Sequence, residues 1–280
     1  MLKRIKNAII LTLIFNIFIC SINYPIYYIS DYDKIVTSKG TEYKNKITEK
    51  IKKHQAGDTI TFGRYEQDNN LDNGEEPIEW VILEKNIDSK YVILISKYII
   101  DCVQFNYTNE DVTWQTSSLR QFMNTEMLSK MFNEEERKHL LPSRLYNSIN
   151  MFNGNYSGEE TVDYIYIPSI DDMYEYFSKN ELDGPKKKKE LLKPNDKRIC
   201  YGTDYAIGKG LRISSGNKTY SKKCNYLLRT TGLNGRRKWY NNVYATYFQS
   251  FVTELGEVVP SGTCVISKDD GIRPMIKISY

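Results

Sequence analysis

Hydrophobic and polar residues follow two different patterns along this chain. Residues 8–29 carry no charge and are mostly apolar, and a run of about 20 such residues is long enough to cross a bilayer as a helix. From Gly57 onward the pattern becomes an alternation, in which Ile60 and Phe62 are separated by polar or small residues, and this is typical of a strand. The pattern therefore predicts an N-terminal membrane segment followed by a domain rich in β-strands.

The residues that flank the apolar stretch predict its orientation. Lys3, Arg4 and Lys6 precede it, and basic residues favour the cytoplasmic side of a bilayer. We therefore expect residues 8–29 to anchor a single-pass protein in the cell membrane, with its C-terminal domain outside the cytoplasm. A cleaved signal peptide is the alternative, because Ile9–Cys20 also suits the apolar core of such a peptide. The protein would then be secreted.

These patterns divide the chain into three parts. Residues 1–30 form the membrane anchor or signal segment, residues 31–56 a polar stalk, and residues 57–280 a single α+β domain. Inside the domain, residues 183–198 are predicted to form a basic loop that varies in sequence. The wider region 186–238 holds 16 Lys and Arg against three acids, although the whole chain has a net charge of only +4. Such an excess is either a solvated surface or a site for an anionic polymer.

Short β-branched and aromatic runs predict the strands of the domain. Residues 78–84 and 90–96 are two such runs around the polar sequence KNIDS, which is the pattern of a β-hairpin. The C-terminal part is again β-rich, in the sequences CNYLLRTTG, VYATYFQSFVTELGEVV and GTCVISKDDGIRPMIKIS. Glycine residues separate these runs and indicate turns between strands.

Helices are expected at three places between the strands. Apolar residues at helical spacing predict a helix over 119–131, with Ser118 as its N-cap and its methionines in the core. A second short helix is expected after Asn133, which is followed by three acids. Ser169 and Asp172 have the spacing of a capping box and predict a third helix.

The acidic sequence DNNLDNGEEPIEW, residues 68–80, has some features of a calcium loop. Asp68, Asn70 and Asp72 alternate as oxygen ligands do, and Glu79 holds the twelfth position. An EF-hand needs a helix on each side, whereas both flanks here have strand patterns. We therefore predict a polar turn, in which Asn-Gly supplies positive φ angles, and expect no cofactor. A loose calcium site formed by Asp68, Asn70 and Asp72 is the alternative.

Four cysteines lie beyond the first thirty residues: Cys102, Cys200, Cys224 and Cys264. They allow three pairings into two disulfides, which an exported protein would favour. Buried free thiols are the alternative. The sequence contains no pair of cysteines at CxxC spacing, so a zinc site is not expected.

The sequence offers little for catalysis. His54 lies in the predicted stalk, and His139 is predicted to be a solvated residue at a helix end. Motifs of serine hydrolases, zinc proteases and nucleotide-binding loops do not occur. Tyrosines are interleaved with the basic residues of 186–238, but no nucleic-acid-binding motif accompanies them, so nucleic acid is not expected as a partner. An enzyme is less favoured than a binding protein.

The order of several motifs resembles a known bacterial family. FGRYEQ, PIEWVILE, TWQTSSLRQFMN, LLRTTG and GIRPMIKI are similar, in this order, to the domain of unknown function 6273, over residues 57–280. The family's motif usually reads like W-W-L-R-S, and Tyr226 and Leu227 stand here in place of its tryptophan pair. The resemblance implies an α+β, C-type-lectin-like fold with twisted antiparallel sheets and two or three short helices. It also implies a distant similarity to formylglycine-generating enzymes.

Together these features favour an extracytoplasmic binding module for a glycan, a cell-wall polymer or a surface protein. The alternatives are a cryptic enzyme and a ligand-free scaffold, and the oligomeric state stays open. The candidate ligand-binding residues lie in or next to the family-like motifs: Arg120, Arg229, Arg273, Trp114 and Tyr226. Guanidinium groups hold carboxylates or phosphates through paired hydrogen bonds. The competing interpretation is structural, with arginines buried against backbone carbonyls and tryptophans in the core.

Overall fold

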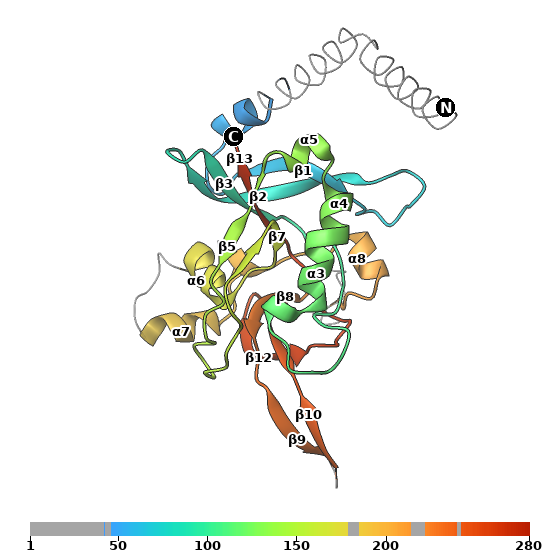
Figure 1. The fold of residues 1–280 in the computed structure, drawn as a ribbon, viewed down its shortest axis with the longest axis vertical. Coiled ribbons are helices and arrows are strands. Elements are labelled where there is room, and N and C mark those ends of the chain that lie inside the picture. The colour runs from blue at the N-terminus through green and yellow to red at the C-terminus, as the bar shows by residue number, and fades with distance from the viewer. Residues whose placement is uncertain (1–41, 43–45, 179–184, 214–221, 240–241) are drawn as a thin grey trace, which may run out of the picture. The chain divides into compact units, whose positions relative to one another are not determined.

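The computed structural model describes residues 42, 46–178, 185–213, 222–239 and 242–280, with the backbone alone for 185–187, 235–239 and 242–246 (Figure 1). The chain divides into two compact units, Met1–Glu49 and Lys50–Tyr280. The predicted membrane segment, residues 8–29, and the first part of the stalk lie outside the described residues. Among the residues that are described, no helix has the length and apolar character needed to span a membrane.

The second unit is an α+β domain with antiparallel sheets, as predicted. Its largest sheet has the strand order β1-β2-β3-β13-β4, and β7 also pairs with β13. The strands are β1 (Thr59–Tyr65), β2 (Glu76–Asn86), β3 (Tyr91–Ser96), β4 (Leu140–Leu141), β7 (Ile165–Tyr166) and β13 (Met275–Ser279). The predicted hairpin is confirmed, since β2 pairs antiparallel with β3. β13 therefore joins segments that are distant in sequence.

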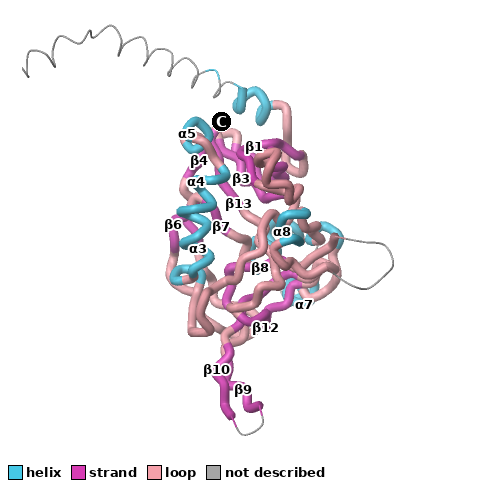
Figure 2. Tube along the Cα trace, turned by 90° about the vertical axis from the view of Figure 1, so that its right-hand side faces the viewer, coloured by secondary structure: helices cyan, strands magenta, loops and turns pink. Residues whose placement is uncertain are grey.

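A second sheet has three strands, in the order β12-β11-β8. It consists of β8 (Tyr226–Thr231), β11 (Phe248–Val252) and β12 (Val258–Cys264), and every residue of β8 is buried. Two further antiparallel pairs are β5 (Ser143–Leu145) with β6 (Thr161–Asp163), and β9 (Gly235–Trp239) with β10 (Asn242–Thr246). The β9–β10 ribbon extends away from the other strands (Figures 1 and 2).

The predicted helix over 119–131 is present, with one shift at its start. It runs through α3 (Ser118–Phe122), the π-helical η2 (Met123–Met127) and α4 (Leu128–Met131), and its three methionines are buried in the core. The N-cap is Ser117, whose hydroxyl accepts a hydrogen bond from the backbone N–H of Arg120. The prediction of Ser118 as N-cap was wrong, because adjacent serines are indistinguishable by spacing alone. α3, α4 and α5 (Glu134–Arg137) follow one another along one edge of the domain (Figure 2).

The other predicted caps are confirmed. Asn133 caps α5 and Ser169 caps α6 (Ile170–Phe177), each in a capping box. These motifs are local, since the cap and its partner lie three residues apart.

The predicted loop over 183–198 is partly helical, so that prediction needs correction. α7 spans Pro185–Leu191, and a 3-10 turn, η3, spans Asp196–Arg198. Lys, Glu and Leu favour helix formation, and Pro185 holds the first helical position, where proline is tolerated. With α8 (Asp204–Gly208), the helices of the described residues are short, as expected, but more numerous than two or three.

Candidate functional site

A cavity of about 590 Å³ lies between α6 and strands of the largest sheet and of the three-stranded sheet. We call it the Arg229 cavity. Its lining residues come from α6, β3, β5, β7, β8, β13 and the segment after β5, and Figure 1 labels these elements. Chief among the lining residues are Tyr146, Tyr166, Tyr174, Tyr176, Arg229 and Lys277. The cavity thus brings together segments that are far apart in the sequence.

Arg229 lies on the fully buried strand β8 and is only 5% exposed. Its Nη1 donates to the carbonyl oxygen of Ile167, 3.0 Å away, and pairs with the carboxylate of Asp172. The Arg229 Nε–H has no hydrogen-bond partner in the part of the chain that the structure describes. A buried donor without a partner costs about 1–3 kcal/mol. The guanidinium is therefore held in place but retains one unused donor.

The start of α6 explains why Asp172 faces Arg229. The backbone N–H and the hydroxyl of Ser169 both donate to the Asp172 carboxylate, at 2.7 and 3.0 Å. The Ser169 hydroxyl in turn accepts from the Asp172 N–H at 3.0 Å. One carboxylate thus caps a helix and neutralises the buried arginine.

A network of tyrosines stands beside this ion pair. Tyr91 and Tyr176 both donate to the carboxylate of Glu84, at 2.9 and 3.4 Å. The Lys277 ammonium lies 3.8 Å from the centroid of the Tyr91 ring, which is the geometry of a cation–π contact. The network fixes the Tyr176 ring and the Lys277 side chain at the cavity.

Burial raises the pKa of two cavity tyrosines, Tyr166 and Tyr176, and the negative charge of Asp172 raises the pKa of both further. Desolvation disfavours the phenolate form. Both hydroxyls therefore stay protonated at neutral pH and are able to donate hydrogen bonds.

The charges that line the cavity balance. The cations are Arg144, Arg229 and Lys277, and the acids are Asp171, Asp172 and Glu175. Arg144 also forms an ion pair with Glu160 outside the cavity lining, at 2.5 Å. The lining is therefore polar and aromatic, with no large excess of either charge.

Arg120 and Trp114 lie at a different place and share one partner. The Arg120 Nε is 2.8 Å from one oxygen of Asp163, and the Trp114 indole N–H donates to the other at 3.0 Å. Trp114 is fully buried, and Arg120 lines a separate cavity of about 380 Å³. The structure therefore does not bring Arg120 and Arg229 into one site.

Arg273 and Tyr226 are buried in contact with each other. The Arg273 Nε donates to the carbonyl oxygen of Ser96 at 3.0 Å, and its Cζ lies 5.4 Å from the centroid of the Tyr226 ring. The Tyr226 hydroxyl donates to the carbonyl oxygen of Arg198 at 2.9 Å. These contacts join β3, η3 and β8, and they match the structural interpretation of Arg273.

Sequence reasoning missed Arg198, the most buried arginine of the described residues. It is 0% exposed, and its guanidinium donates to Ser178 Oγ and to backbone carbonyls, among them those of Lys193 and Gly256. No motif surrounds Arg198, and its partners are mostly backbone atoms. No sequence pattern distinguishes it from the exposed basic residues nearby.

Comparison with known proteins adds a family. The family model described as Domain of unknown function (DUF6273) matches residues 89–280. The chain belongs to this family. Searches of curated proteins and of solved structures found no match. The DUF6273 match covers the Arg229 cavity and every candidate arginine, but the family description states no activity.

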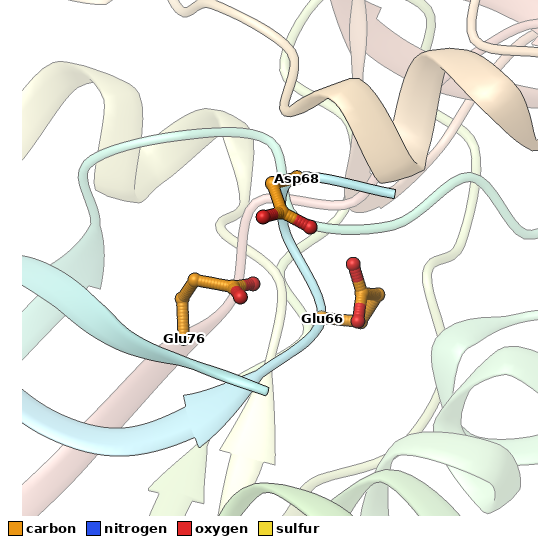
Figure 3. Close-up of side chains that lie close together, drawn as sticks. All are labelled: Glu66, Asp68 and Glu76. Atoms are coloured by element: carbon orange, nitrogen blue, oxygen red, sulfur yellow. The ribbon is translucent and has the colours of Figure 1, made fainter. Parts of the chain in front are cut away.

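A second polar cluster lies before the DUF6273 match, at the turn between β1 and β2. Figure 3 shows Glu66, Asp68 and Glu76, whose oxygen atoms lie within 4.8 Å of one another. Burial and the nearby charge of Glu76 raise the pKa of Glu66. Hydrogen bonds from the Asn73 side chain and the Asn70 backbone lower the pKa of Asp68. The acids thus sit in unequal environments within one cluster.

The turn predicted at DNGEEP, residues 72–77, is confirmed as far as residue 75, because this segment connects β1 and β2 and Gly74 has a positive φ, whereas Glu76 and Pro77 already belong to β2. Of the predicted calcium ligands, Asp68 belongs to the cluster, whereas the Asn70 side-chain oxygen accepts from the Asp72 N–H at 3.4 Å. Both Asp68 oxygens already accept hydrogen bonds at 2.8 Å. Calcium requires six to eight oxygen ligands, so the three carboxylates alone are a partial fit, and a loose calcium site stays the alternative to a polar turn.

The four cysteines of the DUF6273 domain are free thiols in the structure, and Cys102, Cys200 and Cys224 are buried. Burial raises the pKa of Cys102 to about 12 and that of Cys224 to about 11. Folded thiols with such pKa values are poor nucleophiles at neutral pH.

His139 is also buried, at 5% exposure, so the prediction of a solvated residue was wrong. It immediately precedes β4, which pairs with the interior strand β13, and its carbonyl oxygen accepts from the Ser279 N–H at 2.8 Å. His139 is buried because the chain passes from α5 into β4, whose Leu140 is buried, after only two residues.

Proposed function

We propose that this protein is a membrane-anchored, extracytoplasmic binding module that holds a glycan or cell-wall polymer in the Arg229 cavity. The observation that carries the proposal is a cavity of about 590 Å³ with tyrosine walls and balanced charges. Ligand sites commonly measure about 300–1,000 Å³ and combine aromatic walls with a few fixed polar groups.

The chemistry of the lining favours a sugar over a strongly charged ligand. A tyrosine ring offers an apolar face to the carbon side of a sugar ring, and its hydroxyl adds a hydrogen bond. Tyr146 is 63% exposed and lines the cavity, whereas Tyr166 and Tyr174 are buried. Carboxylates and ammonium groups at the same cavity are suitable partners for sugar hydroxyls.

Two sequence features support the location and the polymer. The apolar residues 8–29 with their basic flank favour export of the domain behind an anchor. The basic region 186–238 would attract an anionic wall polymer over a longer range than contact. A C-type-lectin-like layout, which the family resemblance implies, belongs to the same proposal.

The carboxylate that contacts Arg229 suits binding better than catalysis. The Asp172 carboxylate accepts from the Ser169 N–H and hydroxyl and pairs with Arg229. A general acid or base must reach the substrate proton, whereas this carboxylate is committed to the protein. Turnover of a bound glycan would instead support the alternative of a cryptic enzyme.

The test is binding of the full-length protein, in mild detergent, to a panel of glycans and purified wall polymers. Tyr146→Ala is expected to weaken the best ligand about tenfold, because it removes one aromatic face worth about 1.4 kcal/mol. Tyr107→Ala is the matched control, since Tyr107 is also 63% exposed but is not among the cavity residues. Absence of binding across a saturating panel would overturn the proposal in favour of a protein partner or a scaffold.

Ionic strength separates the cavity from the basic region. If high salt lowers the affinity of both the parent and Tyr146→Ala, a charged contact exists that does not depend on Tyr146. The polymer would then contact the basic region as well as the cavity. A salt-independent affinity would restrict recognition to the cavity.

A further inference from the structure

Two cysteines lie opposite each other on adjacent backbone segments. Tyr201 and Lys223 form an antiparallel bridge. The Cys224 N–H donates to the Cys200 carbonyl oxygen at 3.1 Å, and the Gly202 N–H donates to the Lys222 carbonyl oxygen at 2.8 Å. This register places Cys200 directly across from Cys224, on the same face of the two segments.

The register meets the distance requirement of a disulfide. Hydrogen-bonded residues that face each other in an antiparallel pair have Cα atoms about 5.5 Å apart, and disulfides commonly join Cα atoms about 4.4–6.8 Å apart. Both thiols are buried, at 1% and 0% exposure. Burial and the neighbouring sulfur of Cys200 raise the pKa of Cys224, which agrees with close approach of the two side chains.

The sulfurs of all four cysteines have polar neighbours in the structure, since the Cys200 thiol donates to the carbonyl oxygen of Lys97 at 3.4 Å and the Cys224 thiol to that of Lys222 at 3.2 Å. The Cys102 thiol donates to the carbonyl oxygen of Lys268 at 3.0 Å, and the Cys264 sulfur lies 3.9 Å from the side-chain oxygen of Asn109. The backbone register places Cys200 opposite Cys224, and it favours this pair among the six pairs that the four described cysteines allow.

We propose that Cys200 and Cys224 form a disulfide in the exported protein. The two thiols lose two protons and two electrons as the S–S bond forms. The disulfide of an exchange partner, such as oxidised glutathione or an oxidised dithiol protein, takes them up and becomes two thiols. Both sulfurs are covered in the folded chain, so the exchange occurs during folding, before the two segments pair. The proposal rests on the exported location in the proposed function and not on the ligand.

The disulfide would fix one wall of a second cavity. Tyr201, Gly202 and Lys222 lie next to the two cysteines and line a cavity of about 620 Å³. Crosslinking the segments holds these residues in register, and the chain between Cys200 and Cys224 becomes a closed loop. Closing a loop restricts the unfolded chain and so raises the melting temperature.

The experiment is peptide mapping of the full-length protein in mild detergent, refolded from the reduced, denatured state in a glutathione redox buffer. Free thiols are alkylated, and the protein is digested without reductant and analysed by mass spectrometry. The expected result is a linked peptide pair containing Cys200 and Cys224. The oxidised form is expected to melt about 5 °C or more above the reduced form.

Variants assign the linkage. Cys102→Ala and Cys264→Ala are expected to keep the linked peptide and the melting shift, whereas Cys200→Ala and Cys224→Ala should lose both. Alkylation of Cys200 and Cys224 as single thiols after oxidative refolding, or linkage of either to Cys102 or Cys264, would overturn the proposal. The wild-type map decides this even if a variant fails to fold, and glycan binding by the reduced protein tests the proposed function separately.

Discussion

Arg198 donates hydrogen bonds to segments around Ser178, Lys193 and Gly256, which lie apart in the sequence. Its Nε reaches the carbonyl oxygen of Gly256 at 2.6 Å, and its Nη1 and Nη2 reach Ser178 Oγ and the carbonyl oxygen of Lys193 at 2.8 Å. A guanidinium has five N–H donors in a rigid plane. It therefore satisfies carbonyl groups that a loop buries without forming a strand or helix.

Replacing Arg198 is expected to destabilise the domain strongly. In Arg198→Met the side chain keeps a similar length, but the buried carbonyl oxygens lose their donors, so we expect a loss of about 3 kcal/mol or more in the free energy of unfolding. Urea unfolding followed by fluorescence measures it. Lys189→Ala, on the exposed side of α7, should change stability by less than about 0.5 kcal/mol. Equal effects of the two variants would contradict a structural role for Arg198.

Asp270 gives the domain a pH-dependent contribution of known sign. Burial raises the pKa of its carboxyl group, although a hydrogen bond from Asn225 opposes the shift. The folded-state pKa therefore lies above the unfolded value of about 3.9. The protonated Asp270 carboxyl group contributes to the free energy of unfolding. This contribution is complete when the pH is below the unfolded-state pKa, and it is lost as the pH rises through the folded-state pKa.

Asp270→Asn removes that titration and keeps an acceptor for Asn225. The stability of the parent relative to Asp270→Asn is therefore expected to rise as the pH falls from about 7 to about 4. Urea midpoints of both proteins at several pH values measure the difference in stability. The contributions of the other carboxylates are the same in both proteins and cancel in this difference. A difference that stays constant with pH would contradict the raised pKa.

At the residue scale, the sequence predicted which arginines to watch but not their roles. Arg120, Arg229 and Arg273 stand in recognisable motifs, and only Arg120 and Arg229 line the cavities described above. Arg273 holds the Ser96 carbonyl in the core, and Arg198 has no motif at all. The partners are mostly backbone oxygens from distant segments, and a backbone oxygen leaves no trace in the residue type.

At the scale of elements, local signals were reliable. The capping residues Asn133 and Ser169 and the hairpin of β2 and β3 were predicted, because their partners lie a few residues away. α7 was missed, because the lysine run suggested a solvated loop although lysine is a good helix former. The Arg229 cavity was not predictable, since it needs α6 to meet strands from both sheets.

The α6 cap links stability to the proposed ligand site. Ser169→Ala removes a hydroxyl that caps the helix and holds Asp172, so we expect a loss of about 1 kcal/mol in stability and weaker ligand binding. Asn133→Ala removes the equivalent cap from α5, where none of the cavity residues lie. It should cost similar stability and leave binding unchanged. Melting curves and binding isotherms of both variants test this, and unaltered binding by Ser169→Ala would separate the cap from the site.

At the scale of the whole molecule, the proposed location makes a fractionation prediction. The full-length protein is expected in the membrane fraction, where detergent releases it and high salt does not, because the apolar segment 8–29 holds it by burial in lipid. Deletion of residues 1–30 should abolish this association. A shortened form in the medium would support a cleaved signal peptide. Recovery of the unprocessed chain from the cytosol would contradict export.

The position of β13 sets a condition on how this domain is made. β13 pairs with β3, β4 and β7, and those partners precede it by more than a hundred residues. Contacts between such distant segments form slowly. A translation product cut off before β13 would leave edges of β3, β4 and β7 unpaired, and exposed strand edges invite aggregation. The largest sheet is complete only once residues 275–279 are available, so a chaperone would need to shield the chain until then. Quality-control proteases would recognise incomplete copies by their exposed strand edges.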